Sequence, residues 1–363
     1  MTEPRFLFLA PDIRGSSGGV AVLYLCAEIL RTNGLDAVVV HQSRRGQYWN
    51  VSSTAKVAYT YCLRRRLGRG VGLLVRLKKE AGVLVDWFRG GSSARLTVQP
   101  SDILVVPEFM LAMLQRTFPA SQKIVFVQNP FSYLPAVSAS VRQGTDPHGG
   151  VALNLGVSQI CLDALELTDA SPIAHVPVGP SFERFRFAET KKLQIAYMPR
   201  KRWPESRVVV DALRRCKEMN GVELIEIDGQ PQDSVAKILA ESMFFISFMR
   251  RESLGFPAME AMASGCVVIG YTGLGGREYF DSQTGIPVVE DDTPALVHAV
   301  EGAVAAYRRD PTVYEEMRRR AAALVSERYS RGRTEKALLD ALACAGLLVK
   351  ASEAKGQASG PLT

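Results

Sequence analysis

The sequence predicts an α/β protein with parallel sheets in two halves, and three observations carry this prediction. The chain opens with an apolar strand at 5–9, a glycine loop, an apolar helix and a second strand at 37–41, which is a βαβ pattern. The same order recurs at 243–270, where an apolar run of strand length precedes a helix-forming stretch and another apolar run. With 363 residues, the chain is long enough for two domains.

The composition is that of a globular protein with a basic balance. Hydrophobic residues make up 47% of the chain, and Lys plus Arg exceed Asp plus Glu by 44 − 37 = 7. This charge suits nucleic acid, anionic lipid and phosphate substrates alike, so it does not choose among them. The six cysteines are scattered without metal-ligand spacing, which is typical of free thiols in a reducing compartment.

Two further features predict where the protein is located. The first residues, MTEPRFLFLAPD, carry acids on both sides of a short apolar run, which favours a strand over a signal peptide. No uninterrupted apolar run approaches the ~18 residues of a membrane helix. We therefore expect a cytoplasmic protein, and we keep contact with the inner face of the membrane as an alternative.

The first turn of the chain contains Gly18 and Gly19, ahead of a helix that ends at Asn33-Gly34. The turn lacks the Gly-x-Gly-x-x-Gly spacing, and no acid closes the second strand, so NAD binding is disfavoured. The two glycines serve either a tight turn or a close approach of the backbone to a ligand.

Polar residues follow the next two predicted strands, at 102–106 and 123–128. Glu108 comes after the first of them, and Gln128 and Asn129 come at the end of the second. Such side chains can hydrogen-bond an acceptor or a sugar hydroxyl, or they can simply face water. A strand at 154–158, a helix and a strand that begins near 173 complete the predicted first domain.

The segment 44–95 is basic and irregular. From Arg64 to Lys79 it is rich in arginine and lysine, and apolar residues recur there at helical spacing. A basic amphipathic helix can lie on an anionic membrane surface. We favour a helix that packs its apolar face on the domain's own sheet and keep the membrane contact as the alternative.

The predicted second domain opens with a strand at 193–198 that runs into Arg200, Lys201 and Arg202. Three cations at the carboxyl end of a strand suit a diphosphate, because arginine and lysine both bind phosphate oxygens. A solvated basic loop is the alternative. Strands at 222–228 and 285–289 and helices at 234–241, 294–308 and 314–348 follow, and the last residues predict a disordered tail.

The stretch 251–280 organises the second domain. Glu252 follows an apolar strand, Pro257 favours the first turn of a helix, and Glu260 falls on that helix. A glycine loop that leads into a helix offers backbone N–H groups and a positive dipole end to a phosphate. Carboxylates on both sides of such an anion site suit hydroxyl groups, because an ionised carboxylate only accepts hydrogen bonds. A nucleoside-diphosphate sugar has this distribution of groups.

This stretch resembles the Glu-x7-Glu signature of the retaining GT-B glycosyltransferases of group 1, or family 4-like, type. The resemblance rests on Glu252, Glu260, the Gly-Phe-Pro loop between them and the later Gly-Gly-Arg-Glu, and it is dense over 251–292. It implies a GT-B fold, in which two Rossmann-like doubly wound domains face each other across a cleft. Many relatives place a histidine where this chain has Gln128, so a histidine role is not carried over.

The resemblance also implies domain bounds and residue roles. It predicts an acceptor-binding domain at 1–181, a linker at 182–191, a donor-binding domain at 192–330, a helix at 331–349 that crosses back, and a tail at 350–363. Catalysis would rest on Glu252 with Arg200 and Lys201. The predicted donor-binding residues are Glu260, Gly255, Phe256, Pro257, Arg202, Gly18 and Gly19, and the acceptor-side residues are Gln128, Asn129 and Glu108.

The expected activity is sugar transfer, of hexosyl or deoxyhexosyl type, from a nucleotide-diphosphate sugar. The acceptor would be a saccharide, a lipid-linked glycan or a small molecule, with retention and without a metal or another cofactor. A GT-B nucleotide-sugar epimerase and a non-catalytic binder of nucleotide sugars or nucleic acid are the alternatives. We do not expect nucleic acid as the partner, and the sequence leaves the base, the sugar and the acceptor open.

Overall fold

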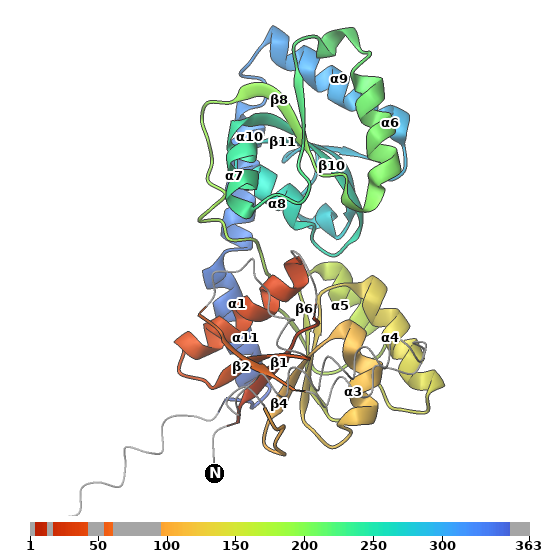
Figure 1. Cartoon of the computed structure of the whole chain (residues 1–363), viewed down its shortest axis with the longest axis vertical. Helices are drawn as coiled ribbons and strands as arrows, with labels where there is room; N and C mark the ends of the chain where they lie inside the picture. Colours follow the sequence, from red (N-terminus) through yellow and green to blue (C-terminus); the bar gives the residue numbers. More distant parts are fainter. Residues whose placement is uncertain (1–3, 13–16, 43–53, 61–95, 349–363) are drawn as a thin grey trace, which may run out of the picture.

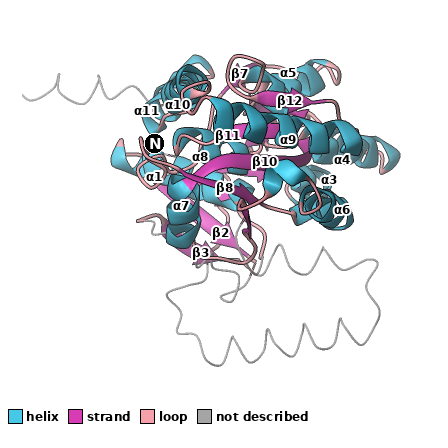
Figure 2. Ribbon diagram, turned by 90° about the horizontal axis from the view of Figure 1, so that it is seen from above, coloured by secondary structure: helices cyan, strands magenta, loops and turns pink. Residues whose placement is uncertain are grey.

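The computed structural model describes residues 4–12, 17–42, 54–60 and 96–348, and it confirms the α/β prediction. Two parallel sheets lie in two lobes, each with helices packed against it (Figure 1 and Figure 2). The predicted basic helix from Arg64 to Lys79 and the predicted tail at 350–363 lie outside the described residues.

The first lobe contains a parallel sheet of seven strands in the order β3-β2-β1-β4-β5-β6-β7. Strand β1 pairs with both β2 and β4, so the strand order reverses at β1. In open α/β sheets, ligands bind beyond the carboxyl ends of the strands near such a switch point. The elements are β1 (Phe6–Leu9), α1 (Gly18–Thr32), β2 (Ala37–His41), β3 (Lys56–Tyr59), β4 (Ile103–Pro107), η3 (Glu108–Met110), α3 (Leu111–Thr117), β5 (Lys123–Val127), α4 (Pro130–Arg142), β6 (Val151–Gly156), α5 (Gln159–Glu166) and β7 (Ile173–His175).

The second lobe contains a five-stranded parallel sheet in the order β12-β11-β10-β8-β9. The buried runs of β10 and β11 lie at its centre, as expected for parallel strands covered on both faces. The elements are β8 (Lys192–Tyr197), η4 (Arg200–Arg202), α6 (Trp203–Leu213), η5 (Lys217–Met219), β9 (Glu223–Glu226), α7 (Gln232–Glu241), β10 (Ser242–Glu252), α8 (Phe256–Ala263), β11 (Val267–Leu274), η6 (Gly275–Glu278), β12 (Ile286–Val288), α9 (Thr293–Arg309), α10 (Glu315–Arg328) and α11 (Arg331–Cys344).

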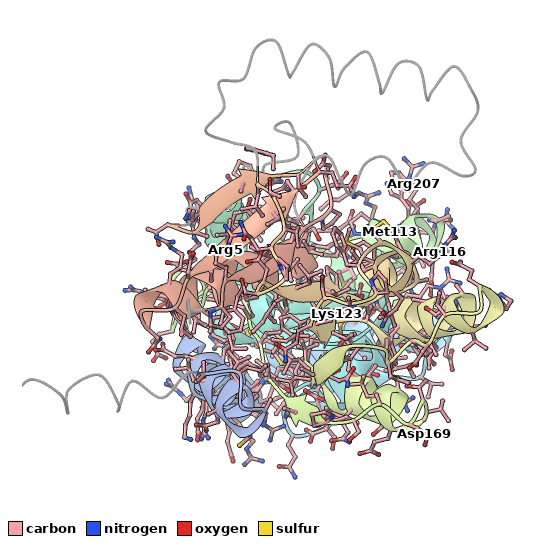
Figure 3. The ribbon with its side chains drawn as sticks, turned by 90° about the horizontal axis from the view of Figure 1, so that it is seen from below. Arg5, Met113, Arg116, Lys123, Asp169 and Arg207 are labelled. Carbon is pink, nitrogen blue, oxygen red and sulfur yellow. The ribbon has the colours of Figure 1, made fainter. Side chains whose placement is uncertain are left out.

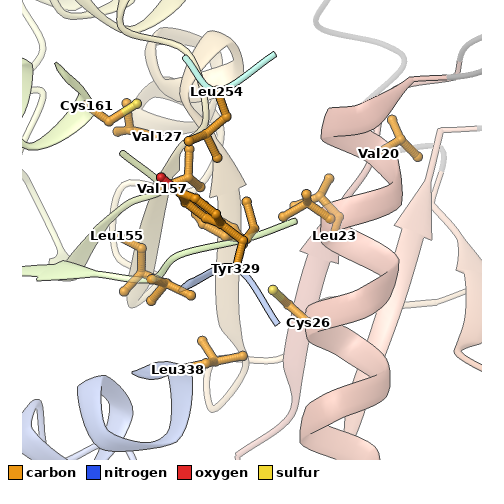
Figure 4. Packing of buried hydrophobic residues seen from close by; sticks show 14 of the residues in the cluster. Val20, Leu23, Cys26, Val127, Leu155, Val157, Cys161, Leu254, Tyr329 and Leu338 are labelled. Atoms are coloured by element: carbon orange, nitrogen blue, oxygen red, sulfur yellow. The ribbon is translucent and has the colours of Figure 1, made fainter. Parts of the chain in front are cut away.

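One hydrophobic cluster joins the two lobes. Leu254 and Tyr329 are buried in the same cluster as Val127 and Val157 of the first lobe, and Figure 4 shows these side chains packed together. Helix α11 then returns to the first lobe, where Thr334 donates a hydrogen bond to the Pro177 carbonyl at 2.7 Å. In Figure 1 this last helix lies beside α1, and it also contacts β7 at the edge of the sheet. The lobes therefore share packing at the point where the chain crosses back.

Polar contacts stabilise the starts of the strands on the face of the first lobe that is turned away from the second lobe (Figure 3). Arg5 donates to both carboxylate oxygens of Asp102, at 2.9 and 2.8 Å, and so ties β1 to the start of β4. Lys123 is buried, and its ammonium donates to the Ser121 carbonyl at 2.8 Å. Desolvation lowers the pKa of Lys123. These contacts fix the starts of the strands and leave their carboxyl ends for the site.

Several elements differ from the sequence-based expectation, among them β3, α1 and the last helices. Strand β3 was not predicted, and helix α1 begins at Gly18, so both glycines of the first turn are already helical. The predicted helix 314–348 is two helices, because Tyr329 turns into the core and the Ser330 hydroxyl caps α11 by accepting from the Arg333 N–H at 3.3 Å. Among the described residues, no helix combines the length and the apolar character that crossing a membrane would need.

Candidate functional site

A cavity of about 490 Å³ lies where the two lobes meet. The amino end of α1 lines it from the first lobe, together with the linker around Phe182. Phe256, Pro257 and Glu260 of α8 line it from the second lobe, and the loop that follows β9 completes it. Of the predicted donor-binding residues, this cavity therefore brings together Gly18, Phe256, Pro257 and Glu260.

Glu252, which precedes α8 in the chain, forms an ion pair with Lys201. Glu252 is the last residue of β10, and its carboxylate lies 2.8 Å from the Lys201 ammonium. Lys201 belongs to η4, directly after β8, which neighbours β10 in the sheet. The predicted catalytic carboxylate and one predicted diphosphate ligand thus contact each other. Arg200 lies in the same turn.

Glycines allow this part of the backbone to fold. Gly255 precedes α8 with a φ of +79°, and a Cβ placed on it would lie 1.9 Å from the Met249 sulfur. A Cβ on Gly275 would lie 1.7 Å from the Ser253 carbonyl oxygen. Both distances are far below van der Waals contact. The Ser253 oxygen belongs to the backbone, so a larger residue at position 275 would displace the loop that carries Glu252, and at position 255 the left-handed φ is the main constraint. The glycines noted in the sequence therefore have a structural reason that is independent of any ligand.

Arg202 is committed to an internal network. Only 4% of it is exposed, and it pairs with Glu205, Glu290 and Asp291, with the Glu290 contact at 2.5 Å. Its guanidinium also lies 4.5 Å from the centre of the Tyr271 ring. Because its donors are taken, we assign Arg202 a structural role in place of the diphosphate contact that the basic triplet suggested. Lys201 and Arg200 remain as the predicted diphosphate ligands.

The predicted acceptor-side residues gather at the ends of β4 and β5. Glu108 is buried, and one carboxylate oxygen accepts from the Gln128 N–H at 3.1 Å. Burial raises the pKa of Glu108 to about 7, and the hydrogen bond from Gln128 opposes this shift. The Gln128 side chain lies 3.2 Å from where a Cβ on Gly19 would be. Gly19, Gln128 and Glu108 therefore form one group at the carboxyl end of the first sheet.

Direct contacts hold the two lobes together next to these groups, and sequence reasoning missed them. The hydroxyls of Ser158 and Ser253 lie 2.8 Å apart across the lobes. The Glu278 carboxylate accepts from the Gln159 N–H at 3.0 Å and from the Tyr329 hydroxyl at 2.5 Å. The partners of these contacts are 95, 119 and 51 positions apart, so no local pattern could have revealed them.

The four histidines lie outside this arrangement. His41 hydrogen-bonds the Tyr24 hydroxyl at 2.8 Å, and His148 contacts the Thr168 carbonyl at 2.7 Å. His175 contacts the Val157 carbonyl, and His298 lies next to Glu301 on α9. None of the four lines the cavity. The positions of the histidines therefore do not support the epimerase hypothesis, for which histidines in the cleft were expected.

Comparisons with known proteins agree with this geometry. The model of the family described as glycosyl transferases group 1 matches residues 203–306. An alpha-1,6-glucosyltransferase from Actinobacillus pleuropneumoniae is 31% identical over 193 residues, which cover 51% of this chain and 58% of the relative. The alignment thus spans little more than half the length of this curated relative.

Solved structures resemble the whole chain. Sucrose-phosphate synthase from Thermosynechococcus elongatus has a TM-score of 0.65 at 12% identity, covering 93% of this chain and 98% of that one. Anabaena HepE in complex with UDP-glucose has a TM-score of 0.62 at 13% identity, with 94% and 99% covered. S. aureus TarM has a TM-score of 0.63 at 10% identity, with 93% and 99% covered. At these identities the likeness shows the GT-B fold, and with the family match and the curated relative it supports a GT-B glycosyltransferase.

Proposed function

We propose that the protein transfers a sugar from a nucleotide-diphosphate sugar to an acceptor, with retention of configuration and without a metal ion. One observation carries the proposal: two carboxylates flank the start of α8, one paired with a cation and the other lining the cavity between the lobes. This is the distribution of charge that the hydroxyls and the diphosphate of such a donor require.

The donor would lie across the amino end of α8. Its nucleoside would occupy the cavity, with the ribose hydroxyls donating to Glu260. The diphosphate would accept from the backbone N–H groups of Gly255 and Phe256 and from Lys201, where the helix dipole adds a positive end. The HepE structures, solved with UDP and with UDP-glucose, lend support because they share the fold.

Donor binding would rearrange the Lys201–Glu252 pair. A diphosphate competes for the ammonium, which frees the Glu252 carboxylate to accept from hydroxyls of the transferred sugar. Lys201 would then stabilise the negative charge that develops on the leaving diphosphate. Together with the helix dipole it supplies the cationic surroundings on which the metal-independent proposal rests. The acceptor would attack from the face that the nucleotide leaves, which is the origin of retention.

The acceptor would enter from the first lobe, where Glu108, Gln128 and Asn129 lie at the strand ends. We propose a glycan, lipid-linked or small-molecule acceptor. TarM, a fold relative, is solved with fondaparinux, alpha-GlcNAc-glycerol and UDP, which supports a glycan. The glucosyltransferase relative supports a hexosyl donor. A cytoplasmic location stays a prediction from the sequence.

A binding experiment separates the roles of the two carboxylates. Thermal shift and calorimetry with UDP, GDP, ADP and their sugar conjugates should find one nucleotide that stabilises the wild type. Glu260→Ala should weaken the free nucleotide roughly tenfold or more, because a charge-assisted hydrogen bond is lost. Glu252→Gln should keep the free nucleotide and lose the preference for its sugar conjugate.

Glu316→Ala is the matched control, since this exposed carboxylate lies on α10 of the same lobe. It should bind every ligand as the wild type does. The proposal fails if no nucleotide binds, or if the Glu260 and Glu316 variants behave alike.

A further inference from the structure

A bulge precedes Glu252 and distorts the backbone. Strand β10 pairs in register with β11 as far as Met249, and the register shifts before Glu252. Within the bulge, Arg251 has a φ of +49°, a left-handed conformation that is uncommon for residues with a side chain. Bulges and such backbone outliers occur preferentially next to functional sites, where they redirect a side chain.

The bulge directs Arg251 towards the first lobe. Its guanidinium carbon lies 5.9 Å from the centre of the Phe131 ring, at the start of α4. Its carbonyl accepts from the Asn129 side-chain amide at 3.5 Å, which is a long hydrogen bond. Arg251 thus belongs to the donor lobe by sequence and contacts the acceptor side in space.

The Arg251 charge is exposed and has no acidic neighbour. Within the described part of the chain, no carboxylate lies within 4 Å of its guanidinium. The adjacent Arg250 differs, because an acidic residue lies near it. The hydrogen bond from Arg202 lowers the pKa of Asp291, and the nearby positive charge of Arg250 lowers it further. Arg251 is therefore available to an anion that enters from solution.

One exposed aromatic ring, Phe131, adjoins Arg251, and a second, Phe109, lies on a turn that packs against the same helix as Phe131. Phe131 is 37% exposed and Phe109 is 50% exposed, and the turn η3 that carries Phe109 packs against α4. Exposed apolar groups that adjoin polar ones mark binding sites more often than bare surface does. A flat ring next to an arginine suits a ligand that has an apolar face and an anionic group.

We propose that Arg251 selects an acidic acceptor: it binds an oxyanion, carboxylate or phosphate, on the acceptor saccharide, while Phe131 and Phe109 contact the face of the sugar ring. The inference rests on the proposed function, since it presumes that the acceptor occupies the first lobe's side of the cleft. The guanidinium suits both anions because it can donate two parallel hydrogen bonds to either. The strained bulge places this cation one residue from Glu252, next to the expected position of the transferred sugar.

A glycan array with neutral, uronate-containing and phosphorylated oligosaccharides tests the proposal on the full chain. The wild type should bind acidic glycans in preference to neutral ones. Whether uronate-containing or phosphorylated glycans bind more tightly then shows if the recognised anion is a carboxylate or a phosphate. For the best glycan, Arg251→Gln should lose roughly tenfold or more in affinity, because a charge-assisted pair is lost. Arg251→Lys should recover part of it, since the charge remains and the bidentate geometry does not.

Arg142→Gln, at the far end of α4, removes an exposed arginine that contacts Ser138 and should leave binding unchanged. Phe131→Leu should weaken acidic and neutral glycans alike. The proposal is overturned if neutral glycans bind the wild type as well as acidic ones do, if no glycan binds, or if Arg251→Gln and Arg142→Gln have equal effects. Nucleotide binding is measured separately, so a failure of this proposal leaves the donor site standing and is distinguishable from a failure of the proposed function.

Discussion

Replacing Glu108 by glutamine should stabilise the protein at pH 8 much more than at pH 5. Burial raises the pKa of this carboxyl from the ordinary 4.5 to about 7 in the folded protein. Between these values the folded protein holds a proton that the unfolded chain has released. Stability therefore falls as the pH rises through this window, because the unfolded chain binds fewer protons.

The pKa values set the magnitude. The gap from 4.5 to about 7, at about 1.4 kcal/mol for each pH unit, amounts to ~3 kcal/mol. Most of it, ~2 kcal/mol or more, falls between pH 5 and pH 8. Glutamine keeps an oxygen that can accept from the Gln128 N–H and carries no charge to desolvate. The advantage of the variant should thus grow by this amount across the range.

Urea unfolding of both proteins at pH 5, 6, 7 and 8 measures the difference. Glu166→Gln, which removes an exposed carboxylate on α5, is the matched control. If the difference between wild type and Glu108→Gln is the same at pH 5 and pH 8, the carboxyl does not titrate in this window and the reasoning is refuted.

Two other substitutions test the framework around the site by the same unfolding assay. Gly255→Ala should destabilise by at least ~1–2 kcal/mol, because its φ of +79° is left-handed and the new methyl meets the Met249 sulfur. Gly302→Ala, in α9 with open space around it, should be neutral or slightly stabilising, and equal effects would contradict the argument. Arg202→Met should destabilise by ~1–3 kcal/mol, because the partly buried Glu205 and Glu290 lose their charged partner. The exposed pair of Arg214 with Asp211 should contribute less than ~1 kcal/mol, so an Arg214→Met variant as unstable as Arg202→Met would overturn this assignment.

Much of the fold could be predicted because buried parallel strands form continuous apolar runs. The start of α8 was also predictable, since Gly255 and Pro257 mark a helix that begins at Phe256. Strand β3 escaped prediction because it lies at the sheet edge, where its four residues are half-buried or exposed. The break between α10 and α11 depends on the burial of Tyr329, which is a tertiary effect.

The motif of the candidate site is visible in the sequence, whereas the contacts that its residues make are not. Sequence alone treats Arg200, Lys201 and Arg202 as equivalent cations. The structure distinguishes Arg202 through Glu290 and Asp291, which are 88 and 89 positions away. Likewise, the proposed role of Arg251 depends on its contacts with Phe131 and Asn129 of the first lobe, which the sequence does not reveal. Contacts between distant segments of the chain leave no local pattern, so such roles emerge only from the fold.

Proton NMR of purified full-length protein with a panel of nucleotide sugars tests the central claim most directly. We predict that one donor is consumed slowly even in water, and that the sugar released first has the donor's anomeric configuration. Glu252→Gln should abolish the consumption while binding of the free nucleotide persists. If no nucleotide sugar is consumed, or if Glu252→Gln consumes it as fast as the wild type does, the proposed sugar transfer is contradicted.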